Sequence, residues 1–431
     1  MPINDSTHIS NSSAVAESIE ESSNAGHAGA GIDDAESVPT PRSSDPININ
    51  DEFESSGVVQ SESSVSHTID KGRLKGSSEI WYRKEFSDPA TARREWLAQE
   101  FLRLIIPNQT ETRLAFDPRR NVYYILSKEV SGFKPLPTGQ HEKFSNGTYK
   151  GLGSIIIGAY FVHEADLKNG NIGLDDHGTV HKIDGDWSFA SMRSNSQFPK
   201  HTGAIAALQI NRLPFPMTYK AHNWLDIFIE GSLASASDIV ASDIASSRQF
   251  QQEKFETLFK LLLIPDEYLV SFVDSFMPAG AKEYSDFLIE RRHTLLKQVP
   301  KLQGFAQYLK DHREDVEELA CEFTEELEEF VVQGKYSVLL NSKKHDFGDK
   351  VKTQFHEVLN KLNIQPEPES HAEPEPKLLI VDTPSSTPTP SLSNHLESLG
   401  LFKNTCHLGV KRKLAALIEE YESESHSSLR L

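Results

Sequence analysis

Two short runs of the sequence hold the residue types that carry chemistry, residues 163–171 and residues 180–186. Together they supply a carboxylate that can orient a hydroxyl group, a cation that can contact phosphate, and oxygen ligands for Mg²⁺. Phosphoryl transfer needs these groups, because in that reaction the protein contributes position and charge more than covalent chemistry. The four residues of these types are Asp166, Lys168, Asn171 and Asp184.

The stretch between the two runs predicts a β-hairpin. Residues 172–174 and 180–183 are short strand-like runs, and they flank a polar turn at residues 175–178 that ends in glycine. Such a pattern is typical of two antiparallel strands joined by a tight turn. We therefore expect the hairpin to bring Asn171 and Asp184 together.

The order of these residues resembles the protein-kinase superfamily, whose catalytic loop contains Asp-Leu-Lys-x-x-Asn and whose metal-binding Asp follows a short hairpin. The matching residues are Asp166-Leu-Lys-Asn-Gly-Asn171 and then Lys182-Ile-Asp184. The resemblance implies ATP and Mg²⁺ or Mn²⁺ as cofactors. It also implies Asp166 as the catalytic base, Lys168 as a phosphate contact, and Asn171 and Asp184 as metal ligands.

Other interpretations of the same run stay open. A turn rich in Asp and Asn can simply close a loop, or it can bind calcium, although the EF-hand pattern with its later Glu is absent here. Asp186, two residues after Asp184, is a second candidate metal ligand. We rank Asp184 first because Ile183 continues the predicted strand up to it.

The elements that must position these residues begin upstream. Residues 79–86, 113–116 and 121–126 are aromatic or β-branched and predict three strands. A helix lies between the first two strands: Asp88 suits its N-cap and Pro89 its first turn. Its apolar stripe consists of Leu97, Phe101 and Leu104.

That order matches the kinase family, in which a strand lysine neutralises the nucleotide phosphates and pairs with a glutamate on the following helix. The resemblance implies Lys84 as the lysine and Glu95 as its partner, with Glu100 as the competing choice. An ordinary solvated position is the alternative for each of the three. By their order along the chain, Lys128 and Val130 would lie in the hinge that contacts adenine through backbone hydrogen bonds.

The whole chain predicts an α+β fold with two lobes like those of a protein kinase, flanked by non-globular ends. Segments rich in Ser, Pro and acidic residues bury too little apolar surface to offset their ordering entropy. Residues 154–162 are apolar and fit either a strand or a helix. The predicted segments are a disordered stretch at 1–66, a β-rich lobe at 67–135, a helical lobe at 136–362, a Pro-, Ser-, Thr- and Glu-rich linker at 363–393, and a short helix with an acidic tail at 394–431.

Composition excludes several classes of protein. The formal net charge of −19 and the pI of about 5.4 argue against nucleic-acid binding, which needs clustered Lys and Arg. Cys321 and Cys406 are too few for a disulfide framework or a cysteine-rich zinc site, which indicates a reducing compartment. No run approaches the roughly 20 apolar residues that span a bilayer, and the N-terminus lacks the pattern of a signal peptide.

The departures from the family pattern indicate a divergent member. Ala165 stands where the family has Arg, Gly185 and Asp186 stand where it has Phe and Gly, and no Ala-Pro-Glu motif follows. Activation by loop phosphorylation is therefore not expected. The Asp-Leu-Lys run favours a Ser/Thr protein kinase. The alternatives are a phosphoinositide kinase and a catalytically altered kinase-fold scaffold.

The end of the chain carries a further resemblance. Residues 419–428 are rich in Glu and Ser and resemble the export signals of Legionella-type type IV secreted effector kinases, with a plain acidic tail as the alternative. The resemblance implies export from the bacterial cytoplasm to a host cytosol, a host protein substrate, and a host activator such as calmodulin or an inositol polyphosphate. The basic clusters at residues 291–293 and 411–413 are candidates for contact with a polyanion or an anionic phospholipid, with solubilising charge as the alternative.

Overall fold

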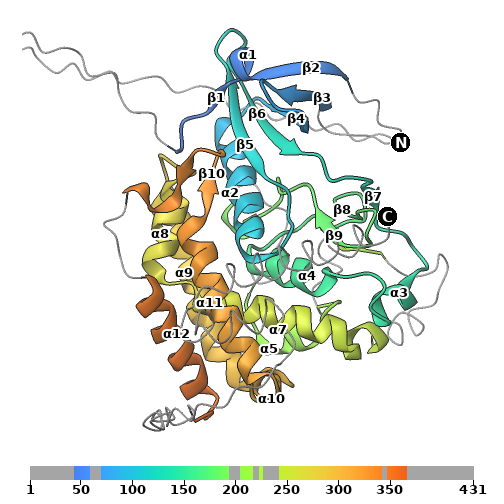
Figure 1. The fold of residues 1–431 in the computed structure, drawn as a ribbon, viewed down its shortest axis with the longest axis vertical. Coiled ribbons are helices and arrows are strands. Elements are labelled where there is room, and N and C mark those ends of the chain that lie inside the picture. The colour runs from blue at the N-terminus through green and yellow to red at the C-terminus, as the bar shows by residue number, and fades with distance from the viewer. Residues whose placement is uncertain are drawn as a thin grey trace, which may run out of the picture. The chain divides into compact units, whose positions relative to one another are not determined.

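The described part of the chain divides into a strand-rich first part and a helical second part (Figure 1). The computed structural model describes residues 43–58, 69–193, 204–216, 223–226, 242–341 and 347–365. The first part contains β1 (Ile47–Asn48), α1 (Ile49–Glu52), β2 (Phe53–Val58), β3 (Ile69–Leu74), β4 (Ile80–Phe86), α2 (Pro89–Ile105), β5 (Thr112–Asp117) and β6 (Val122–Lys128).

The second part is mostly helical. Its strands are β7 (Lys134–Pro135), β8 (Ile172–Leu174), β9 (Val180–Lys182), β10 (Val331–Val332) and β11 (Tyr336–Ser337). Its α-helices are α3 (His141–Ser145), α4 (Leu152–Phe161), α5 (Ala207–Asn211), α7 (Arg248–Leu263), α8 (Asp266–Asp274), α9 (Ala281–Gln298), α10 (Phe305–Asp311), α11 (Arg313–Glu329) and α12 (Phe347–Lys361).

The first part is built on a six-stranded sheet with the order β1-β5-β6-β4-β3-β2. The β1–β5 pair is parallel and the other pairs are antiparallel. Lys84 lies in β4, where it pairs in register with Ile69 of β3 and Ile125 of β6. The lysine is therefore carried by an inner strand, whose backbone is fixed on both sides.

Helix α2 covers one face of this sheet. Asp88 caps its first turn, accepting hydrogen bonds from the backbone N–H groups of Ala90 at 3.2 Å and Thr91 at 2.9 Å. The helix packs against β5 and β6, and its predicted apolar stripe is buried. A smaller cluster of side chains lies apart from this main core: Ile49, Leu74, Trp81, Ala115, Tyr124 and Leu126.

The sheet begins earlier in the chain than the sequence predicts. Residues 43–58 belong to the predicted disordered stretch, yet β1 and β2 lie within them and form both edges of the sheet. The boundary at residue 67 is therefore wrong. The segment has few apolar residues because edge strands are stabilised by backbone pairing, and among its described side chains Ile49 of α1 is the buried apolar one. Residues 1–42 and 59–68 lie outside the described residues.

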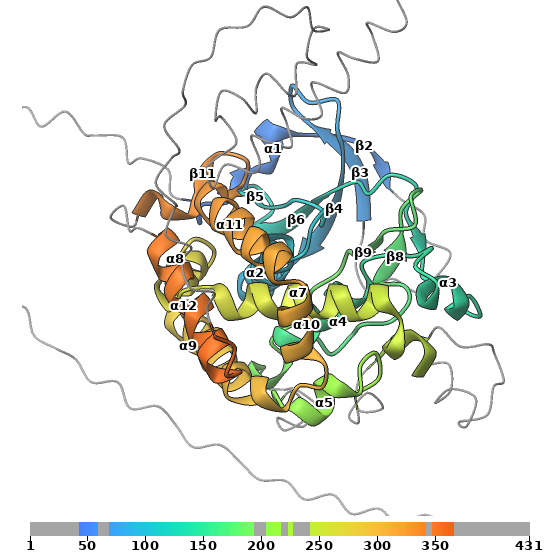
Figure 2. The same cartoon turned by 60° about the horizontal axis from the view of Figure 1, so that its bottom comes forward.

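The apolar run at residues 154–162 belongs to a helix, α4, which resolves the ambiguity left by the sequence. Helix α7 packs against α4, α11 and α12 and so lies at the centre of the helical part (Figure 2). Glu253 of α7 accepts hydrogen bonds from the N–H groups of Gly151 at 2.6 Å and Gly153 at 2.9 Å. This carboxylate caps α4 from a distant part of the sequence, a contact that local patterns do not reveal.

The basic cluster at residues 291–293 is not a surface for polyanions. Arg291 is buried and donates to the carbonyl oxygens of Phe161 and Tyr160, at the end of α4. Arg292 is buried against Asp266, with 2.7 Å between Nη2 and Oδ1. Its guanidinium is therefore already neutralised within the protein. The cluster at 411–413, the linker from residue 366 onward and the acidic tail lie outside the described residues.

The predicted α+β class with a strand-rich and a helical lobe is confirmed. The predicted hairpin is formed by β8 and β9, in which Ile172 pairs with Lys182. Within the described residues, none of the helices combines the length and the apolar character that a bilayer crossing requires.

Candidate active site

Lys84 lies at the centre of a cluster of carboxylates. Its Nζ atom is 3.0 Å from Glu95 Oε2 on α2, 3.0 Å from Asp184 Oδ1 and 3.3 Å from Asp186 Oδ2. The two aspartates follow β9, one hundred residues further along the chain. The structure thus brings the strand lysine, the helix glutamate and the residues after the hairpin to one point.

The competing glutamate lies elsewhere. Glu100 Oε1 accepts hydrogen bonds from Thr112 N and from Thr112 Oγ1, both at 2.7 Å, and its other oxygen binds Arg103. Glu100 therefore ties α2 to the start of β5. The side chain that contacts Lys84 is Glu95, which also accepts a 2.9 Å hydrogen bond from Gln99.

The proximity of these charges shifts their pKa values. Burial acts to lower the pKa of Lys84, but the charges of Glu95, Asp184 and Asp186 outweigh it and hold the pKa above its ordinary value. Burial and the two aspartates raise the pKa of Glu95 to about 8, against the opposing ammonium of Lys84. Burial and the neighbouring Asp184 also raise the pKa of Asp186. Burial acts to raise the pKa of Asp184 as well, but the charges of Lys84 and Lys182 outweigh it and lower that pKa.

This cluster has the donor set for a hard cation. Carboxylate oxygens of Glu95, Asp184 and Asp186 all lie within 4.8 Å of one another. A divalent cation bound here would favour the ionised forms of Glu95 and Asp186, whose pKa values are raised in its absence. Mg²⁺ and Mn²⁺ prefer such oxygen ligands. The residues present therefore fit the predicted metal, with Asp186 as well placed as Asp184.

The residues predicted to form the catalytic loop make a second cluster around Asp166. Its Oδ1 accepts from Asn223 at 2.9 Å, and its Oδ2 accepts from Lys168 at 2.8 Å and from Asn171 at 2.9 Å. The Asn171 amide nitrogen also donates to the Asp166 carbonyl at 2.8 Å, which leaves Oδ1 of Asn171 as the atom suited to a metal. Asp166 is thus held in a fixed orientation.

The two clusters are adjacent. Ile183 N–H donates to the Asn171 carbonyl at 3.0 Å, which joins the end of the hairpin to its beginning. The hydrogen bond to Asp166 raises the pKa of Lys168, and the charges of Asp184 and Asp186 add to that shift. The predicted convergence of Asn171 and Asp184 is therefore present in the structure.

A buried network behind Asp166 was not anticipated from the sequence. Glu164 Oε1 accepts from the Asp166 N–H at 2.9 Å, and Oε2 accepts from Ser188 Oγ at 2.7 Å. Lys182 Nζ forms an ion pair with the same Oε2 at 3.0 Å, and the two side chains are 0% and 1% exposed. Glu164 thus fixes the backbone of the catalytic loop to β9 and to the segment after Asp186.

Different signals existed for the missed residues. Lys182 lies between apolar residues of a short predicted strand, Val180 and Ile183. A lysine in such a place suggests a partner for its charge. Glu164, two residues before Asp166, was within the run already singled out. Asn223 gave no signal, because it lies 57 residues beyond Asp166 in the chain and only the fold brings it near.

A cleft of about 590 Å³ adjoins the two clusters. Residues of both lobes line it, including Tyr82, Lys84, Glu95, Val130, Asn171 and Asp184. Its volume and its few convergent polar groups are those of a small-molecule site. The predicted lysine, its glutamate and both predicted metal ligands thus face one cavity.

The predicted hinge requires one correction. Lys128 N–H donates to the Glu111 carbonyl at 3.0 Å, and the Lys128 carbonyl accepts from Thr110 Oγ1 at 2.6 Å. Both backbone groups of Lys128 are therefore engaged by the loop before β5, and its side chain pairs with Glu79. Val130 also lines the cleft, and its N–H has no hydrogen-bond partner among the described residues. Of the two predicted contacts to adenine, Val130 alone retains a suitable donor.

Comparison with known proteins adds little to this geometry. No family model matches the sequence, and no curated protein matches it. Among solved structures, the chain is similar to the Helicobacter pylori proinflammatory kinase CtkA, with 12% identity and a TM-score of 0.34 over 59% of this chain and 95% of that one. So distant a similarity supports no statement about the site, whose description rests on the contacts above.

Proposed function

We propose that this protein is a phosphotransferase that transfers the γ-phosphoryl group of ATP to a hydroxyl group, with Mg²⁺ or Mn²⁺. The observation that supports the proposal most strongly is the meeting of Lys84 with Glu95, Asp184 and Asp186 beside a cleft that Asn171 also lines. Phosphoryl transfer requires just such a combination of one fixed cation and several metal-binding oxygens.

Each residue has a role in this proposal. Asp184, Asn171 and Asp186 would hold the metal, which when bound neutralises charge on the phosphates. Lys84 binds the α and β phosphates, and Glu95 keeps its ammonium in place. Val130 N–H donates to the adenine base.

The acceptor side of the cleft belongs to Asp166 and Lys168. Asp166 orients the acceptor hydroxyl and takes its proton, as a carboxylate held by Lys168, Asn171 and Asn223 can do without losing its orientation. Lys168 is well placed to leave Asp166 and stabilise the transferring phosphoryl group, because its side chain is 54% exposed.

We further propose a Ser or Thr hydroxyl of a protein as the acceptor, on the strength of the Asp-Leu-Lys run. The resemblance of the sequence to type IV secreted effectors supports a host protein as the substrate and the host cytosol as the site of action. A host activator, such as calmodulin or an inositol polyphosphate, belongs to the same proposal. A phosphoinositide hydroxyl is the second candidate acceptor.

The test is transfer of label from γ-labelled ATP in the presence of Mg²⁺ or Mn²⁺, with and without host-cell lysate. The wild-type chain is expected to label protein. Asp166→Asn is expected to lose about 100-fold or more of that rate, because it removes the proton acceptor. Lys84→Met and Asp184→Asn are expected to fall to background.

Glu85→Gln is the matched control. Glu85 neighbours Lys84 in β4, but its carboxylate pairs with Arg120 at 3.0 Å, away from the carboxylate cluster. This variant should retain the wild-type rate. Label in the lipid fraction alone would favour the phosphoinositide kinase. Nucleotide binding without transfer under any condition would favour the scaffold and contradict the proposal.

A further inference from the structure

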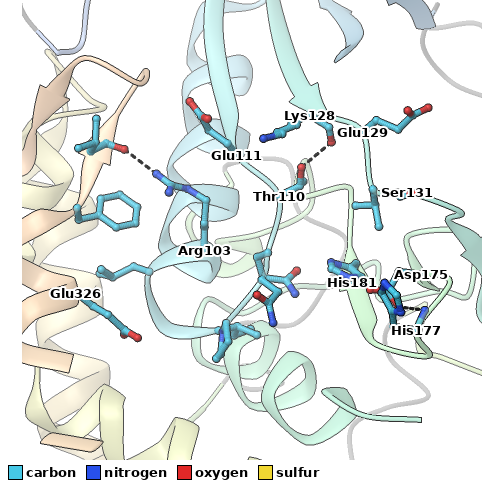
Figure 3. A pocket seen from close by; sticks show the side chains of 18 of the residues that line it. Arg103, Thr110, Glu111, Lys128, Glu129, Ser131, Asp175, His177, His181 and Glu326 are labelled. Carbon is cyan, nitrogen blue, oxygen red and sulfur yellow. Dashed lines mark hydrogen bonds and ion pairs between the residues drawn. The ribbon is translucent and has the colours of Figure 1, made fainter. Parts of the chain in front are cut away.

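A second cavity, of about 680 Å³, borders the nucleotide cleft. Thr110, Lys128, Glu129 and Val130 line both cavities, so the hinge forms a wall that they share. Figure 3 shows Arg103 and Glu326 on one side of this second cavity and Asp175, His177 and His181 on the other. The proposed reaction uses none of these side chains.

The lining of the second cavity is acidic. Its two basic residues, Arg103 and Lys128, are each neutralised by a carboxylate outside the lining, Glu100 and Glu79. Four of its six acidic residues are paired in the same way, Glu111 with Arg113, Glu129 with Lys71, Asp175 with His181 and Glu326 with Lys260, and the other two, Asp176 and Glu329, leave a surplus of negative charge. A polyanion such as an inositol polyphosphate is therefore a poor ligand for this cavity, and a cationic ligand is a good one.

Two of these carboxylates, Asp176 in the β8–β9 turn and Glu329 at the end of α11, are exposed and have no ion-pair partner among the described residues. Asp176 also accepts a 3.5 Å hydrogen bond from Ser131 Oγ. His181 of β9 is buried and binds Asp175 through Nε2 at 3.1 Å, while its Nδ1 has no hydrogen-bond partner in the described part of the chain. The cavity thus offers the carboxylates of Asp176 and Glu329 to a ligand that carries N–H donors.

The cavity also has an apolar rim. Pro107 and Val331 are its exposed residues, with Val331 38% exposed, whereas Ile106 and Phe330 beside them are already buried. A ligand that combines positive charge with aliphatic side chains would bury this rim and neutralise the acids at the same time. A short basic, amphipathic peptide segment has both properties.

We propose that this cavity binds the basic segment of the chain's own C-terminal tail, residues 407–418, through Lys411, Arg412 and Lys413. These form the sole run of three consecutive Lys or Arg residues in a sequence of net charge −19. Leu408, Val410 and Leu414 flank the run and supply the aliphatic groups for the apolar rim.

The tether is long enough for this contact. Helix α12 packs against α11, whose 17 residues end at the cavity, and a helix of that length is about 25 Å long. Lys411 lies 46 residues beyond Gln365, and a chain of that length can extend well beyond 25 Å, since an extended chain covers about 3.3 Å per residue. The tail can therefore reach the cavity within the same molecule.

Occupation of the cavity would act on the nucleotide site through the shared hinge. The segment that supplies the Val130 N–H is the wall that the tail would contact. A tail bound there and a nucleotide in the cleft would then influence each other's affinity reciprocally. The same three cations cannot bind an anionic phospholipid while they occupy the cavity.

A disulfide cross-linking experiment on the full chain tests the proposal without requiring any catalytic activity. Cys321→Ser leaves Cys406, five residues before Lys411, as the single native thiol. Ser131→Cys places a second thiol on the exposed lining of the cavity, and Ser87→Cys places one at an exposed serine that does not line it. Thermal unfolding of each variant verifies that it is folded.

The proposal predicts that mild oxidation links residues 131 and 406 within one molecule at least tenfold faster than residues 87 and 406. Lys411→Glu, Arg412→Glu and Lys413→Glu together should abolish the difference, as should high salt. Equal rates at the two positions, or no effect of charge reversal, would overturn it. A covalent dimer as the main product would assign the cavity to a second copy's tail and would also overturn it.

Discussion

Glu95 is buried within the cluster of carboxylates around Lys84, and its pKa of about 8 affects the stability of the fold. In the unfolded chain the pKa returns to about 4.5. A raised pKa means that the folded state binds the proton more tightly than the unfolded state does. The contribution of Glu95 to the free energy of unfolding is therefore fully present below pH 4.5 and is lost as the pH rises through 8.

We therefore expect the free energy of unfolding to fall between about pH 5 and pH 8.5 more steeply in the wild-type chain than in Glu95→Gln, which cannot ionise at this position. Chemical denaturation at a series of pH values, without nucleotide or metal, measures the two slopes. Parallel curves for the two proteins would show that Glu95 is already ionised at low pH and that its environment differs from the one described.

The Glu164–Lys182 pair makes a separate prediction. Removing one member of a buried pair leaves the other charge without its partner, so Lys182→Met is expected to lower the free energy of unfolding by about 3–5 kcal/mol. The double variant Lys182→Met/Glu164→Gln should recover part of this loss because no buried charge remains. Urea unfolding measures both; a loss below 1 kcal/mol for the single variant would mean that the pair is hydrated.

At the scale of the elements, the packing of α4 depends on glycine. A Cβ atom on Gly153 would lie 2.7 Å from the Phe250 carbonyl oxygen and 3.0 Å from Lys254 N, both backbone atoms of α7. Gly153→Ala is therefore expected to lower the free energy of unfolding by about 1–3 kcal/mol, because the two helices must move apart.

Gly170→Ala serves as the control for that variant. The nearest atom to a Cβ on Gly170 is the flexible Lys168 Cε at 4.0 Å, so its stability should change by at most about 0.5 kcal/mol. If both variants are equally stable in urea, α4 and α7 are not in the close contact described.

The N-terminus of α2 offers a prediction about the position of Glu95. Asp88→Ala removes the cap and should cost about 1 kcal/mol, whereas Asp88→Ser, which retains an acceptor, should cost little. Because α2 carries Glu95, fraying of its first turn should also raise the KM for ATP. Denaturation and steady-state kinetics of both variants test this, and a KM equally raised by Asp88→Ser would exclude capping as the cause.

The elements differ in how far the sequence predicts them. Helix α2 and the β8–β9 hairpin were predictable because their caps, turns and apolar spacing are local. Strands β1 and β2 were not, because edge strands stabilised by backbone pairing have no apolar signature. The first turn of α4 is capped by Glu253 from α7, a contact between residues about one hundred positions apart that local patterns do not reveal.

At the scale of the whole molecule, the candidate site also contains residues that sequence patterns predict and residues that they do not. Lys84, Glu95, Asp166, Asn171 and Asp184 follow the spacing of a known motif, so their approach to one another was predictable. Asn223 and the Glu164–Lys182 pair were not, since their roles arise only where distant segments meet. The hinge was predicted by order alone, and the order did not reveal that the N–H of Lys128 is bonded to the Glu111 carbonyl.

The central claim of this account is that the loop at Asp166 and the end of the hairpin at Asp184 act on one metal ion bound with ATP. Electron paramagnetic resonance of Mn²⁺ with a non-hydrolysable ATP analogue tests it most directly. The account predicts that the nucleotide tightens Mn²⁺ binding to the wild-type chain and to Glu85→Gln. Asp184→Asn and Asn171→Ala should each weaken the same bound ion at least tenfold. Unchanged Mn²⁺ affinity in both variants would contradict it.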